Sequence, residues 1–235
     1  MNPDTFIWVA LAVAGGAFIQ GTTGMGFALV VAPVLGLLAP SLLPISLLLL
    51  MLPLNALVAW RERHAIDMLG TKWISLGRVL GTFGGLWVLV VLPLSQLNIL
   101  IGVSTIAASL VSWLAPAFSP GRKAFVSTGV ITGITETATG IGGPPLALVY
   151  QHMPVATLRA SVALCFLIGE LVSLLVLAAS GHLHGELLLP VCWMLPALAA
   201  GLILSQLVHK TVNARFLRQF VLVFALGSGI LVLLQ

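Results

Sequence analysis

Apolar runs occupy almost the whole chain, and few charged residues interrupt them. Several runs approach the roughly 20 residues that an α-helix needs to cross a bilayer. Because hydrocarbon offers no water to an open backbone, runs of this kind fold as helices that span or enter the membrane. The runs fall at about 5–20, 25–38, 42–60, 70–92, 97–115, 124–137, 143–151, 160–180, 187–208 and 216–234. The sequence therefore predicts an all-α integral membrane protein.

The composition excludes several classes of protein. Of the 235 residues, 60% are hydrophobic and only 7% are charged, whereas soluble domains are roughly a quarter charged. The chain cannot cover a soluble domain with polar surface, and it offers no basic patch for a nucleic acid. The runs hold no spaced set of His, Asp, Glu and Cys for catalysis or metal binding, and no glycine loop of the ATP-binding kind. We expect neither an enzyme nor a bound cofactor or metal.

Positive charges divide the connecting segments into two groups. The segments 39–44, 93–96 and 181–186 contain no Lys or Arg. The other segments carry Arg61, Arg63 and Lys72; Arg122 and Lys123; Arg159; and Lys210, Arg215 and Arg218. By the positive-inside rule the basic segments face the cytoplasm. This predicts a multi-pass protein of the plasma (inner) membrane with both termini outside. The first residues lack a basic leader and are expected to belong to the mature chain.

Two glycine–threonine motifs interrupt the apolar pattern. They read GTTGMG at Gly21–Gly26 and ATGIGGPP at Ala138–Pro145. Each motif joins two runs that are too short to cross the membrane comfortably, so each pair is expected to form a broken or re-entrant helix hairpin. Irregular backbone at membrane depth is tolerated only where protein buries it or where it lines a wet cavity. Whether these short helices are re-entrant or full thin crossings stays open.

The two motifs align at an offset of 116 residues, since Thr23 matches Thr139 (139 − 23 = 116). The same offset matches Gln20 to Glu136 and Gly85 to Gly201. Each half, 1–116 and 117–235, then consists of one hairpin followed by three transmembrane helices. The first half begins outside and the second inside, so equivalent helices run in opposite directions. This is an inverted repeat within one membrane domain, a plan typical of secondary transporters.

The hairpin tips are the candidate substrate site. In inverted-repeat transporters the substrate binds near the midplane, where broken helices of the two halves meet. Helix starts offer free N–H groups and a positive dipole end, which favour an oxyanion. The alternative is close helix packing by small residues. The substrate-binding candidates are Thr22, Thr23, Gly24 and Gly26 in the first motif and Thr139, Gly140, Gly142 and Gly143 in the second.

Polar and charged residues inside the runs are candidate coupling residues, because such groups are costly in a membrane. Glu136 either takes up a proton when the substrate binds or braces the second tip by hydrogen bonds. Glu170 is a second proton site or pairs with a buried partner. Arg78 either snorkels to the cytoplasmic surface, or guides anions, or pairs with an acid. Asn55 is expected to bond across helices, and Gln20 takes the place of Glu136 at the first tip.

The motif segments also resemble those of a known family. QGTTGMGFALVVAPVL (20–35) and TGIGGPPLALVYQ (139–151) resemble the paired motifs of the sulfite exporter TauE/SafE family, and the length, the duplicated halves and the motif positions extend this resemblance over the whole chain. The resemblance implies a bacterial-type permease for sulfur-containing anions, driven by an ion or proton gradient.

The residues and the resemblance together predict a secondary transporter of small anions that works by alternating access around the two tips. Sulfur oxyanions or organosulfonates such as sulfite or sulfoacetate are the expected substrates, with proton coupling. The alternatives are a passive anion channel and, further off, a membrane-embedded enzyme or assembly factor. The lipid bilayer is the expected surrounding, no nucleic-acid partner is expected, and a homodimer stays open.

Overall fold

Every element of the described chain is helical. The computed structural model describes residues 3–114, 120–150, 153–183 and 185–208, together with 219, 222–224, 226–227, 230–231 and 233–234 of the last stretch. Its α-helices are α1 (Pro3–Thr23), α2 (Phe27–Leu38), α3 (Ile45–Arg61), α4 (Met68–Val91), α5 (Leu94–Leu114), α6 (Arg122–Thr139), α7 (Gly143–Tyr150), α8 (Val155–Ala179) and α9 (Leu188–Val208). The predicted all-α class is confirmed.

Four helices are long and apolar enough to cross a membrane, and they include α1 with 21 residues. The run 5–20 alone appeared too short for a crossing, but the helix continues through Gly21, Thr22 and Thr23. At about 1.5 Å per residue, α1 is roughly 31 Å long, close to the thickness of the hydrocarbon core. The first part of the expected hairpin is therefore a helix of spanning length, and the break follows Thr23.

The remaining helices follow the apolar runs closely. α6 also exceeds its predicted run 124–137, because Arg122 and Lys123 precede the run and Ala138 and Thr139 follow it, to a total of 18 residues. α2 and α7, with 12 and 8 residues, are too short to cross a bilayer. The predicted run 216–234 and the basic segment with Lys210, Arg215 and Arg218 lie largely outside the described residues.

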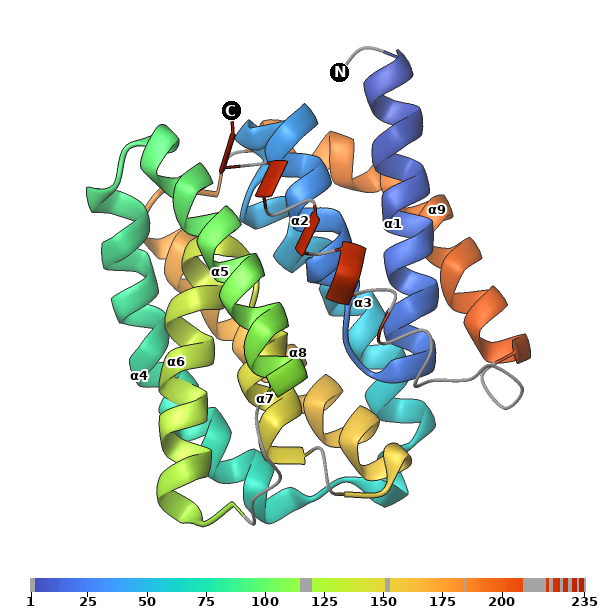
Figure 1. Ribbon diagram of the computed structural model, residues 1–235, viewed down its shortest axis with the longest axis vertical. Coiled ribbons are helices and arrows are strands. Elements are labelled where there is room, and N and C mark those ends of the chain that lie inside the picture. The colour runs from blue at the N-terminus through green and yellow to red at the C-terminus, as the bar shows by residue number, and fades with distance from the viewer. Residues whose placement is uncertain are drawn as a thin grey trace.

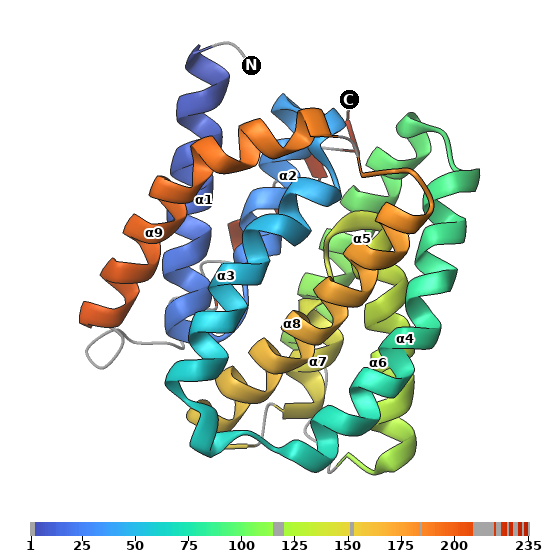
Figure 2. The same ribbon diagram turned by 180° about the vertical axis from the view of Figure 1, so that it is seen from behind.

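Glycines bring pairs of helices into close contact. On α4, a Cβ at Gly77 or Gly81 would overlap backbone oxygens of α6, and a Cβ at Gly129 would overlap the backbone of α4. On α9, a Cβ at Gly201 would overlap the carbonyl oxygen of Ala14 in α1. Close approach through small residues is a usual basis of helix association in membranes. The pairs α4–α6 and α1–α9 thus form two tightly packed flanks (Figures 1 and 2).

Between these flanks, α3 and α8 pack against each other at the centre. The connections that follow α3 and precede α6 and α8 lie at one end of the bundle, and the N-terminus and the α4–α5 connection lie at the other (Figure 1). This arrangement gathers the basic connections at one end. The largest core cluster includes residues of α2, α3, α7 and α8, and a smaller apolar cluster of Ile45, Leu48, Leu174 and Leu177 joins α3 to α8.

Candidate functional site

The first glycine after each helix has the same backbone conformation in the two motifs, although Gly26 (φ 121°) has a positive φ that its counterpart Gly142 lacks. α1 is followed by Gly24 with φ 88°, and α6 ends at Gly140 with φ 78°. The Gly24 N–H donates to the carbonyl of Gln20 at 2.8 Å, and the Gly140 N–H donates to that of Glu136 at 2.7 Å. A left-handed backbone of this kind costs glycine little and other residues more. The glycines therefore end the two helices in the same way.

The threonine hydroxyls of the motifs serve the helix ends. Thr23 Oγ1 lies 2.6 Å from the carbonyl oxygen of Met25 and 2.9 Å from that of Ile19, and Thr139 Oγ1 donates to the carbonyl of Thr135 at 2.7 Å. Thr22 Oγ1 likewise donates to Ile19 at 2.8 Å. In this conformation the hydroxyl hydrogens are thus directed to backbone carbonyls within the helices or just after the end of α1. Their predicted role as substrate donors remains a prediction.

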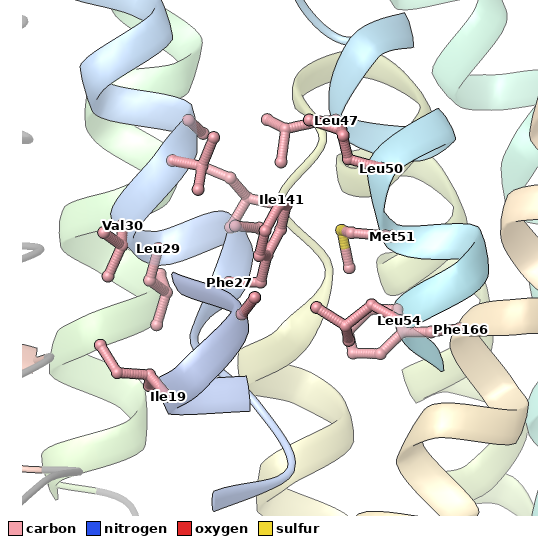
Figure 3. Packing of buried hydrophobic residues seen from close by; sticks show 14 of the residues in the cluster. Ile19, Phe27, Leu29, Val30, Leu47, Leu50, Met51, Leu54, Ile141 and Phe166 are labelled. Atoms are coloured by element: carbon pink, nitrogen blue, oxygen red, sulfur yellow. The ribbon is translucent and has the colours of Figure 1, made fainter. Parts of the chain in front are cut away.

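The tips lie beside different helices. A Cβ at Gly24 would lie 2.6 Å from Cγ of Arg159 at the start of α8, whereas one at Gly140 would lie 2.9 Å from Cδ1 of Leu47 near the start of α3. Phe27 and Ile141, which follow the two breaks, are both buried in the main core. Figure 3 shows Phe27 and Ile141 between Leu29 and Val30 of α2 on one side and Leu50 and Met51 of α3 on the other. Gly26, Gly142 and Gly143 are also buried.

Arg78 is the buried cation of the site. Its side chain is 1% exposed, and its Nη2 makes an ion pair with Oε2 of Glu136, which is fully buried. The guanidinium lies over the ring of Phe166 at 5.6 Å and directly against the backbone of Gly169, where a Cβ would overlap it. Of the readings that the sequence left open, snorkelling to the surface is therefore wrong, because α8 and α6 enclose the side chain. Arg78 pairs with an acid.

Several buried polar atoms in and around the ion pair have no hydrogen-bond partner. These atoms are Nε and Nη1 of Arg78, Oε1 of Glu136, Oε2 of Glu170 and Oγ1 of Thr132. We refer to Arg78, Glu136, Glu170 and Thr132 as the polar cluster. A Cβ at Gly142 would lie 2.7 Å from Oε2 of Glu136 and 2.8 Å from Cγ2 of Thr132, so this group borders the second tip. Buried polar groups are nearly always satisfied in proteins. A polar ligand or water molecules therefore fit this place chemically.

A chain of amide hydrogen bonds links the first tip to Glu170. The N–H of Phe27, the first residue of α2, donates to Oε1 of Gln20 at 3.0 Å. Gln20 Nε2 donates to Oδ1 of Asn55 at 2.9 Å, and Asn55 Nδ2 donates to Oε1 of Glu170 at 2.6 Å. Asn55 thus bonds across helices, as expected. Glu170 is fully buried, and the hydrogen bond that it accepts comes from the amide of Asn55 and not from a cation.

Two arginines and a glutamate hold the end of α1 at the first tip. Arg159 binds Glu62 through Nε at 3.0 Å and through Nη2 at 2.6 Å, and its Nη1 donates to the carbonyl of Thr22 at 3.1 Å. Arg61 Nη2 donates to the carbonyl of Gly21 at 2.9 Å. Two guanidinium groups thus hold the last carbonyls of α1, where the helix dipole is negative. We refer to Arg61, Glu62 and Arg159 as the inner latch.

Sequence reasoning missed the latch and part of the polar cluster. It used Arg61 and Arg159 only to orient the chain and gave Glu62 no role. Gly169 and Thr132 were also missed, because a single glycine or threonine in a helix carries no signal of its own. Only the pairing of Gly169 with Glu170 next to it, in an otherwise apolar run, marks that turn of α8 as unusual.

A cavity of about 280 Å³ reaches the second tip. It lies among α4, α5 and α6 and touches Ala138 and Thr139, while Trp87, Val91 and Leu100 form part of its apolar wall. Among the described residues, no group of three or more His, Cys, Asp and Glu is arranged to hold a metal ion. The polar cluster around Arg78, by contrast, combines a buried cation with unpartnered donor nitrogens, which is chemistry that suits an anion.

A buried cation inside a bundle of spanning helices, with irregular helix ends beside it, is characteristic of membrane transport proteins. The family comparison is consistent with that class. The model of the sulfite exporter TauE/SafE family matches residues 8–232, and the chain belongs to this family. It is accordingly a membrane protein of a transporter family that handles sulfur-containing anions. Neither the search of curated proteins nor the search of solved structures found a match.

Proposed function

We propose that this protein is a secondary transporter of small anions, and that the anion binds to Arg78 between the two hairpin tips. Sulfur oxyanions and organosulfonates such as sulfite or sulfoacetate are the proposed substrates, in keeping with the family. One observation carries the proposal: Arg78 is completely enclosed, yet two of its three guanidinium nitrogens lack a hydrogen-bond partner. An arginine is well matched to oxyanions, which it binds by two parallel hydrogen bonds.

Glu136 occupies the position on Arg78 that the anion would take. Its carboxylate has the charge and the paired oxygens of an oxyanion, and it binds the Nη2 of Arg78. Uptake of a proton from water by this carboxylate forms an O–H bond and removes the charge that holds Arg78. The guanidinium is then free for the substrate, and release of the proton on the other side of the membrane restores the ion pair. This exchange would couple proton and anion movement.

Alternating access and the inverted repeat belong to the same proposal. In their support, Gly24 and Gly140 share a backbone conformation and an N–H bond to residues that the 116-residue offset pairs, Gln20 and Glu136. The packed pairs α1–α9 and α4–α6 each join a first-half helix to a second-half helix. In this proposal the two repeats comprise residues 1–116 and 117–235. The protein lies in the plasma (inner) membrane, and both of its termini are outside.

Reconstitution into liposomes tests it directly. Purified protein should mediate saturable uptake of radiolabelled sulfite or of an organosulfonate, and a pH gradient should drive accumulation above the external concentration. Arg78→Gln should abolish this uptake, and Glu136→Gln should leave anion exchange while removing the response to the pH gradient. Arg63→Gln, at an exposed cation away from the cluster, should behave as wild type.

Two outcomes would contradict the proposal. Uptake that is unchanged in Arg78→Gln would refute the assignment of the anion site. Flux that never exceeds equilibration under any imposed gradient would favour the passive anion channel instead. The further alternative, a membrane-embedded enzyme or assembly factor, would be favoured if no anion crossed the membrane at all.

A further inference from the structure

One face of α4 is polar in the first part of the helix and apolar in the last. The polar residues of this face, which we call the α4 stripe, are Thr71, Ser75, Arg78 and Thr82. Steps of four, three and four residues place them on one side of the helix. The same side continues with Leu86 and Leu89, which pack against the smaller apolar cluster of α3 and α8. Polar side chains thus lead from the end of the bundle with the basic connections to the polar cluster, and leucines follow.

The hydroxyl groups of the α4 stripe are not all satisfied. A serine or threonine inside a helix commonly donates to a carbonyl of the preceding turn, and Thr82 does so, donating to that of Arg78 at 2.9 Å. Thr71 Oγ1 and Ser75 Oγ are buried and have no hydrogen-bond partner among the described residues. Buried polar groups are nearly always bonded to protein or to ordered water. We therefore expect water molecules to bind beside Thr71 and Ser75.

The spacing of these groups suits a file of single water molecules. Residues three or four positions apart on a helix have Cβ atoms about 5–6 Å apart. A water molecule that bonds two groups spans a similar distance, because each of its hydrogen bonds is about 2.8 Å long. One water can thus join Thr71 to Ser75, and the next can join Ser75 to an unpartnered nitrogen of Arg78. A water that accepts from Arg78 can donate to Oε1 of Glu136, which also lacks a partner.

An acid stands where the α4 stripe begins. Asp67 caps α4 by accepting from two of its first N–H groups, and the hydroxyl of Tyr150 in α7 lies 3.4 Å from its Oδ2. The N–H of Asp67 donates to Oγ of Ser161 in α8 at 2.8 Å. Tyr150 is fully buried, whereas Asp67 is partly exposed. A carboxylate in contact with water therefore stands one helical turn before Thr71.

The cations at the start of α4 and α6 lie away from the stripe. Lys72 and Arg122 lie over the ring of Trp73, at 6.0 Å and 3.6 Å from its centroid. At about 100° per residue, Trp73 is on the side of α4 opposite to Thr71. Lys123, the next residue of α6, is exposed.

The other helix that packs against α4 is α8 (Figure 2). Its ionisable residues are Arg159, Cys165 and Glu170. Arg159 is bound to Glu62, Glu170 accepts from the amide of Asn55, and the thiol of Cys165 is buried. Between Asp67 and Arg78 the stripe itself therefore presents hydroxyl groups and no fixed charge.

From this arrangement we infer that a file of water molecules along Thr71 and Ser75 conducts protons between Asp67 and Glu136. The inference rests on the proton coupling of the proposed function and specifies the route of the proton. At each step an oxygen accepts one proton and releases another, so no charge stays behind, and the carboxylate of Glu136 gains an O–H bond. Thr71 and Ser75 are positioning residues that hold the water. The leucines beyond Thr82 interrupt the file, so Glu136 exchanges protons with the end of the bundle where Asp67 lies.

Proton and anion movement measured in the same proteoliposomes test the route. The probes are radiolabelled sulfoacetate outside and a pH-sensitive dye inside. In the double variant Thr71→Val with Ser75→Ala, proton movement coupled to sulfoacetate uptake should slow by about tenfold or more, because positioned proton-transfer groups contribute at least that much. Exchange of sulfoacetate at equal pH should stay unchanged. Thr71→Ser keeps the hydroxyl and should retain the wild-type rate.

Thr105→Val is the matched control, because it removes a buried hydroxyl that donates within α5, to the carbonyl of Ile101 at 2.7 Å. Wild-type proton movement in the double variant would overturn the route and leave the transporter intact. If the double variant also loses exchange, the single variants decide, and wild-type proton movement in both would overturn the route. Sulfoacetate uptake without proton movement in the wild type would overturn both the route and the coupling. Absence of uptake in the wild type would contradict the proposed function itself.

Discussion

The backbone of Gly169 lies directly against the guanidinium group of Arg78, with no room for a Cβ between them. This contact fixes where the one cation of the cluster can sit, since the ring of Phe166 and the carboxylate of Glu136 enclose it from other directions. A glycine next to the buried Glu170 is therefore a requirement of the site rather than a weakness of α8.

Replacing Gly169 by alanine should displace Arg78 and remove anion transport. Overpacking of this kind costs typically about 1–3 kcal/mol, and the guanidinium would have to leave Glu136. We expect uptake into proteoliposomes to fall by tenfold or more. Gly15→Ala in α1 is the control, because nothing lies within 4 Å of the added methyl group. Full transport activity in Gly169→Ala would contradict the importance of this contact.

The inner latch predicts how one end of the bundle is closed, which is the cytoplasmic end in the orientation proposed above. Glu62→Gln removes the carboxylate that Arg159 binds, so the hold on the first tip weakens. Cys165 is buried about 9 Å further along α8 than Arg159, at about 1.5 Å per residue. We expect its reaction with a membrane-impermeant maleimide, applied to inside-out vesicles, to accelerate about fivefold or more, which corresponds to a loss of roughly 1 kcal/mol.

That experiment uses a Cys192→Ser background, because Cys192 is exposed. Arg63→Gln removes a neighbouring charge that lies outside the latch and should leave the rate unchanged. If Glu62→Gln and Arg63→Gln label alike, the latch does not control access to Cys165.

Asn55→Ala should destabilise the protein in detergent. The change leaves Gln20 Nε2 and Glu170 Oε1 unpaired in the core, and each unsatisfied buried group costs about 1–3 kcal/mol. A clear drop in the unfolding temperature is expected in a thermal scan followed by tryptophan fluorescence. Ser46→Ala removes a buried hydroxyl that has no partner and should change the temperature little. A comparable drop in both variants would argue against the amide chain.

The orientation can be checked with single cysteines in a background without Cys165 and Cys192. Cysteines at Ser41 and Gly181 should react with an impermeant reagent from outside, and one at Arg122 only from inside. This follows from the positive-inside rule. The reverse pattern of labelling would refute the external termini.

Much of the helical fold could be predicted from the sequence. The apolar runs located the helices to within a few residues, because a membrane admits few alternatives to a helix. The extents of α1 and α6 were underestimated at the motifs. Threonine and glycine read as breaks, but both helices continue through Thr23 and Thr139, and the break comes only at the left-handed glycines Gly24 and Gly140 that follow.

The candidate site was predicted less completely. Arg78, Glu136, Glu170, Gln20 and Asn55 stood out because polar groups in apolar runs are costly. Their pairing did not follow from the sequence, since 58 positions separate Arg78 from Glu136 and 115 separate Asn55 from Glu170. Such partners meet only when helices from both halves pack together.

The sequence by itself determined that the chain is a helical membrane protein and that its two glycine motifs match, because hydropathy and helix-ending residues act locally along the chain. Only the tertiary structure decided that Arg78 is enclosed and paired with Glu136, that Gln20 and Asn55 lead to Glu170, and that Arg159 holds the first tip. Ion pairing and burial depend on which helix faces lie together, and that is a property of packing across the bundle rather than of any one segment.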